Sequence, residues 1–97
     1  MDEAVAREHA EAHGRATVAG DMKSAGSDLA PEGMSKAGAV MTKMPKELIG
    51  SSIESVIIKG DIATVRIRYL GTDEEISVDS DWEERDGRPK IVDLRVV

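Results

Sequence analysis

The sequence predicts an α+β fold in which about three N-terminal helices cover one face of a curved, four-stranded antiparallel sheet. The first half of the chain is rich in helix formers, whereas β-branched residues alternate with polar ones from residue 49 onward. Short Gly-containing turns separate the later segments, which is typical of hairpins. Because helices precede strands instead of alternating with them, a doubly wound parallel sheet is excluded. We expect one domain, with its helical part at 2–45 and its sheet at 49–97.

The first predicted helix spans residues 2–19, which lack proline and contain many Ala, Glu and Arg residues. Gly20 is expected to end it, and Asp21 to cap a short second helix that extends to about Leu29. Small residues at helical spacing predict a face that lies close to the sheet. The predicted buried stripe is Val5, His9, Ala12, Ala16 and Ala19.

A third helix is expected to begin at Pro31, whose fixed φ angle suits the first helical position, and to run to about Met44. Pro45 ends the run, because the residue before a proline is disfavoured in a helix. Methionine side chains fill irregular gaps well, so they are expected to face the sheet. The predicted stripe is Met34, Ala37, Met41 and Met44.

Two hairpins set the predicted register of the sheet. A loop at residues 71–73 pairs Arg66 with Asp79 and Ile67 with Val78. The second loop leaves two registers open: a two-residue turn sets Trp82 opposite Ile91, and a three-residue loop sets Trp82 opposite Val92. The three-residue loop sorts the faces more cleanly and also pairs Asp79 with Arg95, so we prefer it.

This register divides the strands into an apolar and a charged face. The apolar face, turned to the helices, comprises Val56, Ile58, Val65, Ile67, Tyr69, Ile76, Val78, Ser80, Trp82, Val92, Leu94 and Val96. The opposite face carries the cross-strand charges of Arg66, Asp79 and Arg95, together with Ile53, Ile57, Ile62 and Ile91.

Composition excludes several classes of partner. The formal net charge of −6 disfavours nucleic acid and anionic membranes, and with one Trp, one Tyr and no Phe a base-stacking surface is not expected. The absence of cysteine removes disulfides and thiolate chemistry. The acidic start Met1-Asp2-Glu3 is unlike a signal peptide, and no apolar run approaches membrane-spanning length, so a cytoplasmic location is expected.

Three stretches resemble the nuclear transport factor 2-like superfamily, which includes ketosteroid isomerases. They are the Ala19–Glu32 region with its Gly-Asp and Ala-Pro steps, VRIRY at Val65–Tyr69, and SDWEERDGRPKIVDLRVV at Ser80–Val97. The resemblance implies a cone-shaped fold with a pocket between sheet and helices. It places His13 where the isomerases have an oxyanion-binding Tyr, and Asp81 where they have an oxyanion-binding Asp. The general-base position falls near Lys36 and Ala37, which cannot serve as a base.

The remaining candidates have plain structural explanations. His9 and His13 share a helix face, as in a two-histidine metal site, but no third ligand is apparent, and we expect neither a metal nor a cofactor. Trp82 is expected to be core. The acidic patch that includes Asp79 and Asp81 is interleaved with Arg66 and other arginines, which is typical of a solvated face and not of a cation site.

The leading hypothesis is therefore a non-catalytic domain that forms a homodimer and binds a small apolar ligand between sheet and helices. The alternatives are an isomerase, cyclase or dehydratase that uses His13 with Asp81, and an accessory subunit of a larger partner. The expected pocket-lining residues are Met34, Met41, Ile67, Tyr69, Val78, Ser80, Trp82 and Leu94. The expected dimer face consists of Ile53, Ile57, Ile62, Arg66, Asp79 and Arg95.

Overall fold

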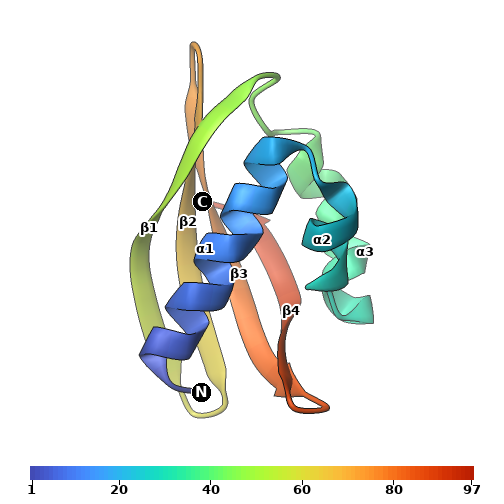
Figure 1. The fold of residues 1–97 in the computed structure, drawn as a ribbon, viewed down its shortest axis with the longest axis vertical. Coiled ribbons are helices and arrows are strands. Elements are labelled where there is room, and N and C mark those ends of the chain that lie inside the picture. Colours follow the sequence, from blue (N-terminus) through green and yellow to red (C-terminus); the bar gives the residue numbers. More distant parts are fainter.

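The computed structural model describes residues Met1 to Val97 and confirms the predicted fold class: three helices pack against a four-stranded antiparallel sheet (Figure 1). The sheet is a meander in the order β1-β2-β3-β4. The helices are α1 (Glu3–Ala19), α2 (Met22–Ser27) and α3 (Pro31–Met41), and the strands are β1 (Leu48–Lys59), β2 (Ile62–Gly71), β3 (Glu75–Arg85) and β4 (Arg88–Val96). No helix is long and apolar enough to cross a membrane.

The end of α1 and the starts of α2 and α3 form where the sequence predicts them, whereas α3 ends at Met41, three residues before the predicted Met44, and α2 ends at Ser27 instead of about Leu29. Gly20 ends α1 in the left-handed region, with φ 75°, and the Asp21 side chain caps α2 by accepting from the Ser24 N–H at 3.2 Å. Pro31 occupies the first turn of α3. These three boundaries therefore follow from local backbone chemistry.

The predicted buried stripe of α1 is wrong by about one residue. The helix buries Ala6, Ala10, His13, Gly14 and Thr17, whereas Val5, Ala12 and Ala19 are exposed. Close approach explains the choice, because a Cβ on Gly14 would collide with the side chain of Ser51 on β1. The smallest residues thus select the face that rests on the sheet.

The hairpin between β3 and β4 combines both registers that the sequence left open. A two-residue turn at Asp86-Gly87, with φ angles of 53° and 78°, sets Trp82 opposite Ile91, so the preferred pairing with Val92 is wrong. A register shift between Asp81 and Trp82 then restores the other predicted pairs, including Asp79 with Arg95. Ile91 consequently faces the core and is fully buried, contrary to expectation.

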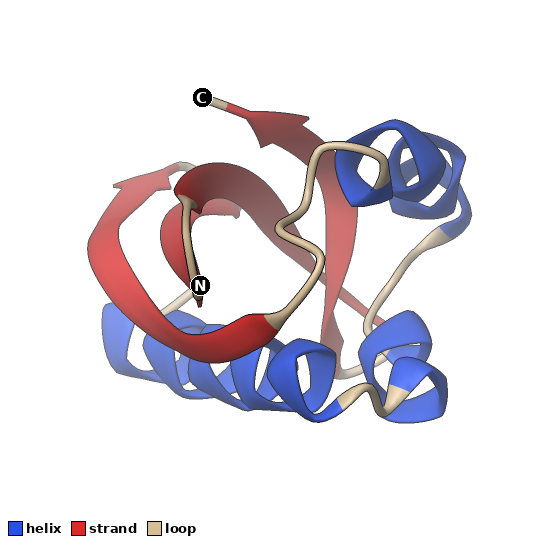
Figure 2. Ribbon diagram, turned by 90° about the horizontal axis from the view of Figure 1, so that it is seen from above, coloured by secondary structure: helices blue, strands red, loops and turns tan.

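A second register shift, between Ile53 and Ser55, changes the face of the first strand. It sets Ile53 opposite Ile67, so Ile53 packs against the core instead of pointing outward as expected. Beyond the shift, Val56 pairs with Val65 and packs against the core as predicted, and Ile57 points outward. Figure 2 shows how strongly the strands curve around the helical side.

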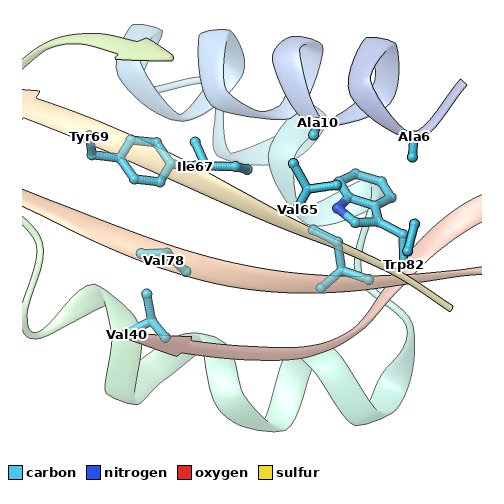
Figure 3. Close-up of a cluster of buried hydrophobic side chains, with 10 residues drawn as sticks. Ala6, Ala10, Val40, Val65, Ile67, Tyr69, Val78 and Trp82 are labelled. Atoms are coloured by element: carbon cyan, nitrogen blue, oxygen red, sulfur yellow. The ribbon is translucent and has the colours of Figure 1, made fainter. Parts of the chain in front are cut away.

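The core is a strip between α1 and the sheet that also reaches α3 (Figure 3). Trp82 lies at one end of the strip, below Ala6 and Ala10, and Tyr69 lies at the other. The buried indole N–H donates to the Ser80 hydroxyl at 2.9 Å, and that hydroxyl donates to the Val65 carbonyl at 2.9 Å. The one large aromatic ring is therefore buried without an unpaired polar group.

The outer face of the sheet is covered by ion pairs between neighbouring strands. Arg66 binds both carboxylate oxygens of Asp79, at 2.8 and 3.2 Å, and Arg95 approaches the same carboxylate at 3.8 Å. Arg95 also contacts Asp81 at 3.0 Å and Asp93 at 2.8 Å. The predicted charge ladder around Asp79 is confirmed.

Candidate functional site

A largely apolar cavity of about 200 Å³ lies between the helices and the sheet. Helices α1, α2 and α3 all contribute to its wall, and the three strands β2, β3 and β4 provide its floor. Helix α1 packs mainly on β1 and α3 on β4 (Figure 2), and the cavity is lined by residues of both helices. The lining residues are His13, Thr17, Met22, Ala25, Gly26, Leu29, Ala37, Val40, Met41, Met44, Tyr69, Val78 and Leu94.

The structure brings together half of the residues expected to line a pocket. Met41, Tyr69, Val78 and Leu94 line the cavity. The residues that do not line it are Met34, Ile67, Ser80 and Trp82. The last three are fully or almost fully buried in the core strip, and Met34 points into solvent because α3 turns Gly33 and Val40 toward the sheet.

His13 is the polar residue of the cavity with the most defined surroundings. Its Nδ1 lies 2.9 Å from Asp28 Oδ2, and Arg88 Nη2 lies 2.8 Å from Asp28 Oδ1. An ionised carboxylate can only accept, so Nδ1 carries the proton of this contact, and Nε2 is the other ring nitrogen left for a further partner. The Trp82 ring meets the imidazole edge-on at 6.0 Å and restricts its rotation.

Asp28 is held in place by its own backbone. It follows α2, and its carbonyl accepts from the Ile91 N–H at 2.7 Å, while the Ile91 carbonyl accepts from the Ala30 N–H at 2.9 Å. The connection between α2 and α3 is thus paired to the edge of β4. This pairing fixes the carboxylate next to His13 and Arg88.

Two polar atoms in the cavity wall make no well-formed hydrogen bond within the protein, although the Thr17 hydroxyl lies near the phenol of Tyr69. Neither His13 Nε2 nor the Tyr69 hydroxyl makes a hydrogen bond that satisfies ordinary geometry, yet no fully enclosed side-chain nitrogen or oxygen lacks a partner. Both atoms therefore reach open space, and the cavity is the space that both residues line. Thr17, between them on the wall, donates its hydroxyl to the His13 carbonyl at 2.9 Å.

Burial changes the acidity of Tyr69. Removal from water raises the pKa of the phenol to about 12 from 10.0, and the neighbouring Thr17 hydroxyl offsets only part of this effect. The phenol therefore stays protonated at neutral pH. In that state it can donate a hydrogen bond into the cavity.

Asp81, the carboxylate that the alternative enzyme hypothesis pairs with His13, lies on the opposite face of the sheet, as the predicted register requires. It accepts from the Thr64 hydroxyl at 2.7 Å and pairs with Arg95. The His13–Asp81 pairing is therefore wrong, because side chains alternate and Ser80 takes the inward position. Asp28 replaces Asp81 as the partner of His13.

The remaining candidates are distributed over both sides of the molecule. His9 is half-buried beside Trp82, and no three His, Cys, Asp or Glu side chains are grouped closely enough to hold a metal ion. At the expected general-base position, Lys36 lies 3.6 Å from Asp93 and Ala37 lines the cavity.

Most residues of the expected dimer face lie on the outer face of the sheet: Ile57, Ile62, Arg66, Asp79 and Arg95. Ile53 instead packs on the core side, contrary to expectation.

No protein-family model, curated protein or solved structure matches the chain. The cavity and the Asp28–His13 pair are thus the features from which a function is inferred.

Proposed function

We propose that this domain binds a small, mainly apolar molecule that carries one polar group, with the apolar part in the cavity. The observation that carries the proposal is the pair of unpartnered polar atoms, His13 Nε2 and the Tyr69 hydroxyl, in a wall that is otherwise almost entirely apolar. Ligand sites commonly combine an apolar lining with a few polar groups that fix orientation. The neutral phenol of Tyr69 donates to the ligand's oxygen, and His13 accepts from or donates to it.

The volume limits the size of this molecule. An engineered apolar cavity of about 150 Å³ binds benzene, so a cavity of about 200 Å³ suits one or two fused rings or a short branched chain. β-Naphthol, with a fused apolar ring and one hydroxyl group, is a suitable probe. Naphthalene is its matched control, because it has the same ring without the hydroxyl.

The test is a titration of both probes by ligand fluorescence. We expect β-naphthol to bind more tightly than naphthalene, by about tenfold for one hydrogen bond to a buried partner. Tyr69→Phe keeps the ring and removes the hydroxyl, so it is expected to reduce this preference while naphthalene binding remains. The remaining preference is what His13 provides. Equal affinities of the unsubstituted protein for the two probes would contradict the polar part of the proposal, and no binding of either would contradict the whole.

Proton transfer is a second candidate function, and the His13–Asp28 contact favours it. A carboxylate that fixes the Nδ1 proton leaves Nε2 as a base directed at a bound molecule, and proton transfer by a positioned side chain accelerates reactions by about 10²–10⁴-fold. Tyr69 would stabilise the oxygen on which negative charge develops. The substrate would be an apolar molecule with an acidic C–H bond near an oxygen.

A nitrobenzisoxazole tests the base directly, because loss of its carbon-bound proton breaks the ring N–O bond and yields a coloured phenolate. We expect turnover that is lost in His13→Gln and retained in His9→Gln, which alters the other histidine beside Trp82. Asp28→Asn is expected to reduce the rate, since an amide that donates to Nδ1 moves the ring proton to Nε2. Equal turnover in both histidine variants would leave only the binding function.

Pairing of two copies through the outer sheet face is part of the proposal. It is supported by the exposed Ile57 and by charges of both signs on one surface, including Arg66 and Arg95 beside Asp79. With Ile53 and Ile91 on the core side, the apolar part of this face is smaller than expected. Membership of the nuclear transport factor 2-like superfamily and a cytoplasmic location remain proposals supported by the element order and composition, and an accessory role remains an alternative.

A further inference from the structure

Two half-exposed methionines from different helices meet the cavity from the solvent side. Met22 on α2 is 47% exposed and Met41 on α3 is 49% exposed, and both line the cavity. Each side chain therefore has one part in water and another against the ligand space. Met34 on α3 is 55% exposed but does not line the cavity, so it is an internal control of equal accessibility.

We propose that Met22 and Met41 form an oxidation site at the mouth of the cavity, and that their conversion to sulfoxides by a hydroperoxide releases the bound ligand. This inference rests on the proposed binding function. The chain has five methionines and no cysteine, so thioethers are its only sulfur groups. The single Trp is fully buried, and Met44, the third methionine of the cavity wall, is less exposed than Met22 and Met41. These two are therefore the most accessible thioethers beside the ligand.

The chemistry needs only the hydroperoxide. A sulfur lone pair of the thioether attacks the terminal peroxide oxygen, the S–O bond forms and the O–O bond breaks. The sulfur loses two electrons, and the proton of the attacked oxygen passes to the leaving oxygen, which departs as water or, from an organic hydroperoxide, as an alcohol. No thiol intermediate and no metal is required.

The sulfoxide changes the cavity wall in polarity more than in size. A sulfoxide oxygen is a strong hydrogen-bond acceptor. The lining residues one helical turn away, Ala25 from Met22 and Ala37 from Met41, have side chains that cannot donate to it. An apolar ligand that covers the sulfoxide would strip it of water without providing a donor. Desolvation of an unpaired polar group costs about 1–3 kcal/mol in proteins, which corresponds to a loss of affinity of about tenfold or more.

The experiment compares three proteins before and after treatment with hydrogen peroxide: the unsubstituted chain, Met34→Leu, and the double variant Met22→Leu/Met41→Leu. Peptide mass spectrometry locates each added oxygen, and β-naphthol titration measures binding. We expect oxidation to weaken β-naphthol binding at least about tenfold in the unsubstituted chain and in Met34→Leu. The double variant is expected to keep its affinity although Met34 becomes oxidised.

Reversal separates a local effect from unfolding. Methionine sulfoxide reductases acting on both sulfoxide epimers restore the thioether, so treatment with them is expected to restore β-naphthol binding. Failure of the untreated protein to bind β-naphthol would overturn the proposed binding function and this inference with it. Normal binding that survives full oxidation of Met22 and Met41, or that falls equally in the double variant, would overturn this inference alone.

Discussion

At the scale of single residues, the chemistry of the cavity depends on how its few polar atoms are held. Asp28 binds His13 on one oxygen and Arg88 on the other, so its charge is compensated although the side chain is buried. The Tyr69 ring is buried for the opposite reason: its phenol is neutral, and burial favours the neutral form. The cavity wall thus carries His13, which is held from behind by the charged Asp28, and the neutral phenol of Tyr69.

The raised pKa of Tyr69 predicts how stability depends on alkaline pH. With a pKa of 10.0 when unfolded and about 12 when folded, Tyr69 loses its proton more readily in the unfolded chain. The contribution of this residue is therefore complete below pH 10 and is lost as the pH rises toward 12. The loss in unfolding free energy is about 2–3 kcal/mol by linkage.

Denaturant titrations at several alkaline pH values measure this loss, with Tyr69→Phe as the control. The variant keeps the ring and shares every lysine and arginine titration, so the difference between the two proteins isolates Tyr69. Because Tyr69 is the only tyrosine, phenolate absorbance reports its ionisation alone. Ionisation of the folded protein near the pH of a free phenol would contradict the prediction.

The residues of the site differ in how far the sequence could predict them. Alternation along the strands was enough to place Tyr69, Val78 and Leu94 toward the helices. Asp28 was missed because it is fifteen residues from His13 and looks locally like a turn residue after a short helix. Only the pairing of its backbone with β4 brings it to His13, and no local signal in the sequence reports that pairing.

At the scale of elements, the connection between α2 and α3 positions both the site and one wall of the cavity. Leu29 forms an isolated parallel β-bridge with Ile91. On β4, Arg88 donates to the Asp28 carboxylate and Lys90 donates to the Ser27 carbonyl. The first turn of α3 lies directly on β4, because Gly33 has no Cβ to collide with the Ile91 carbonyl oxygen. The helix can approach the strand this closely only at a glycine.

Two glycines of α3 give a matched prediction. A Cβ on Gly33 would overlap the Ile91 carbonyl oxygen, whereas a Cβ on Gly38 would meet nothing within 4 Å. Gly33→Ala is therefore expected to lower the free energy of unfolding by about 1–3 kcal/mol, as overpacking does. Gly38→Ala is expected to raise it by about 0.5–1 kcal/mol, because alanine favours the helix.

Urea denaturation of the two variants beside the unsubstituted chain measures both effects. Displacement of α3 in Gly33→Ala is also expected to weaken β-naphthol binding, since Ala37 and Val40 line the cavity. Equal stability of the two variants would show that α3 does not rest on β4 through Gly33.

Helix boundaries and turns could be predicted where local backbone rules set them. The faces of the strands could not be predicted where a register shift lets one strand adjust to its neighbour. Gly20, Asp21 and Pro31 set helix ends through backbone chemistry, and the loop at residues 71–73 sets the predicted pairs of Arg66 with Asp79 and Ile67 with Val78. The shifts near Ile53 and Trp82 could not be read in this way, because a bulge adds one residue without a required side chain. Each shift reverses the faces beyond it, which is why Ile53 and Ile91 were assigned to the wrong side.

At the scale of the whole molecule, one sheet separates two surfaces of different character. The helical side contains the core and the cavity, and the outer side carries arginine–carboxylate pairs. Long arginine side chains cover apolar strand surface with their alkyl stems and keep their charges in water. A four-stranded sheet with helices on one side can therefore expose its outer face, and pairing of two copies must compete with an already satisfied set of ion pairs.

The last prediction is that two copies nevertheless pair through this outer face. Ile57 on β1 is 52% exposed beside Arg66 and Thr64 on β2, so a two-fold operation can bury it against its own copy while the charges exchange partners. Light scattering at micromolar concentration is expected to give a dimer mass, and Ile57→Asp a monomer mass.

The control is Val5→Asp, which places the same charge at an exposed apolar position of α1, away from the outer face. Because surface ion pairs are screened by salt, an interface that depends on exchanged pairs is expected to weaken as ionic strength rises. A monomer mass for the unsubstituted chain would exclude the dimer, and a dimer that survives Ile57→Asp but not Val5→Asp would place the interface on the helical side.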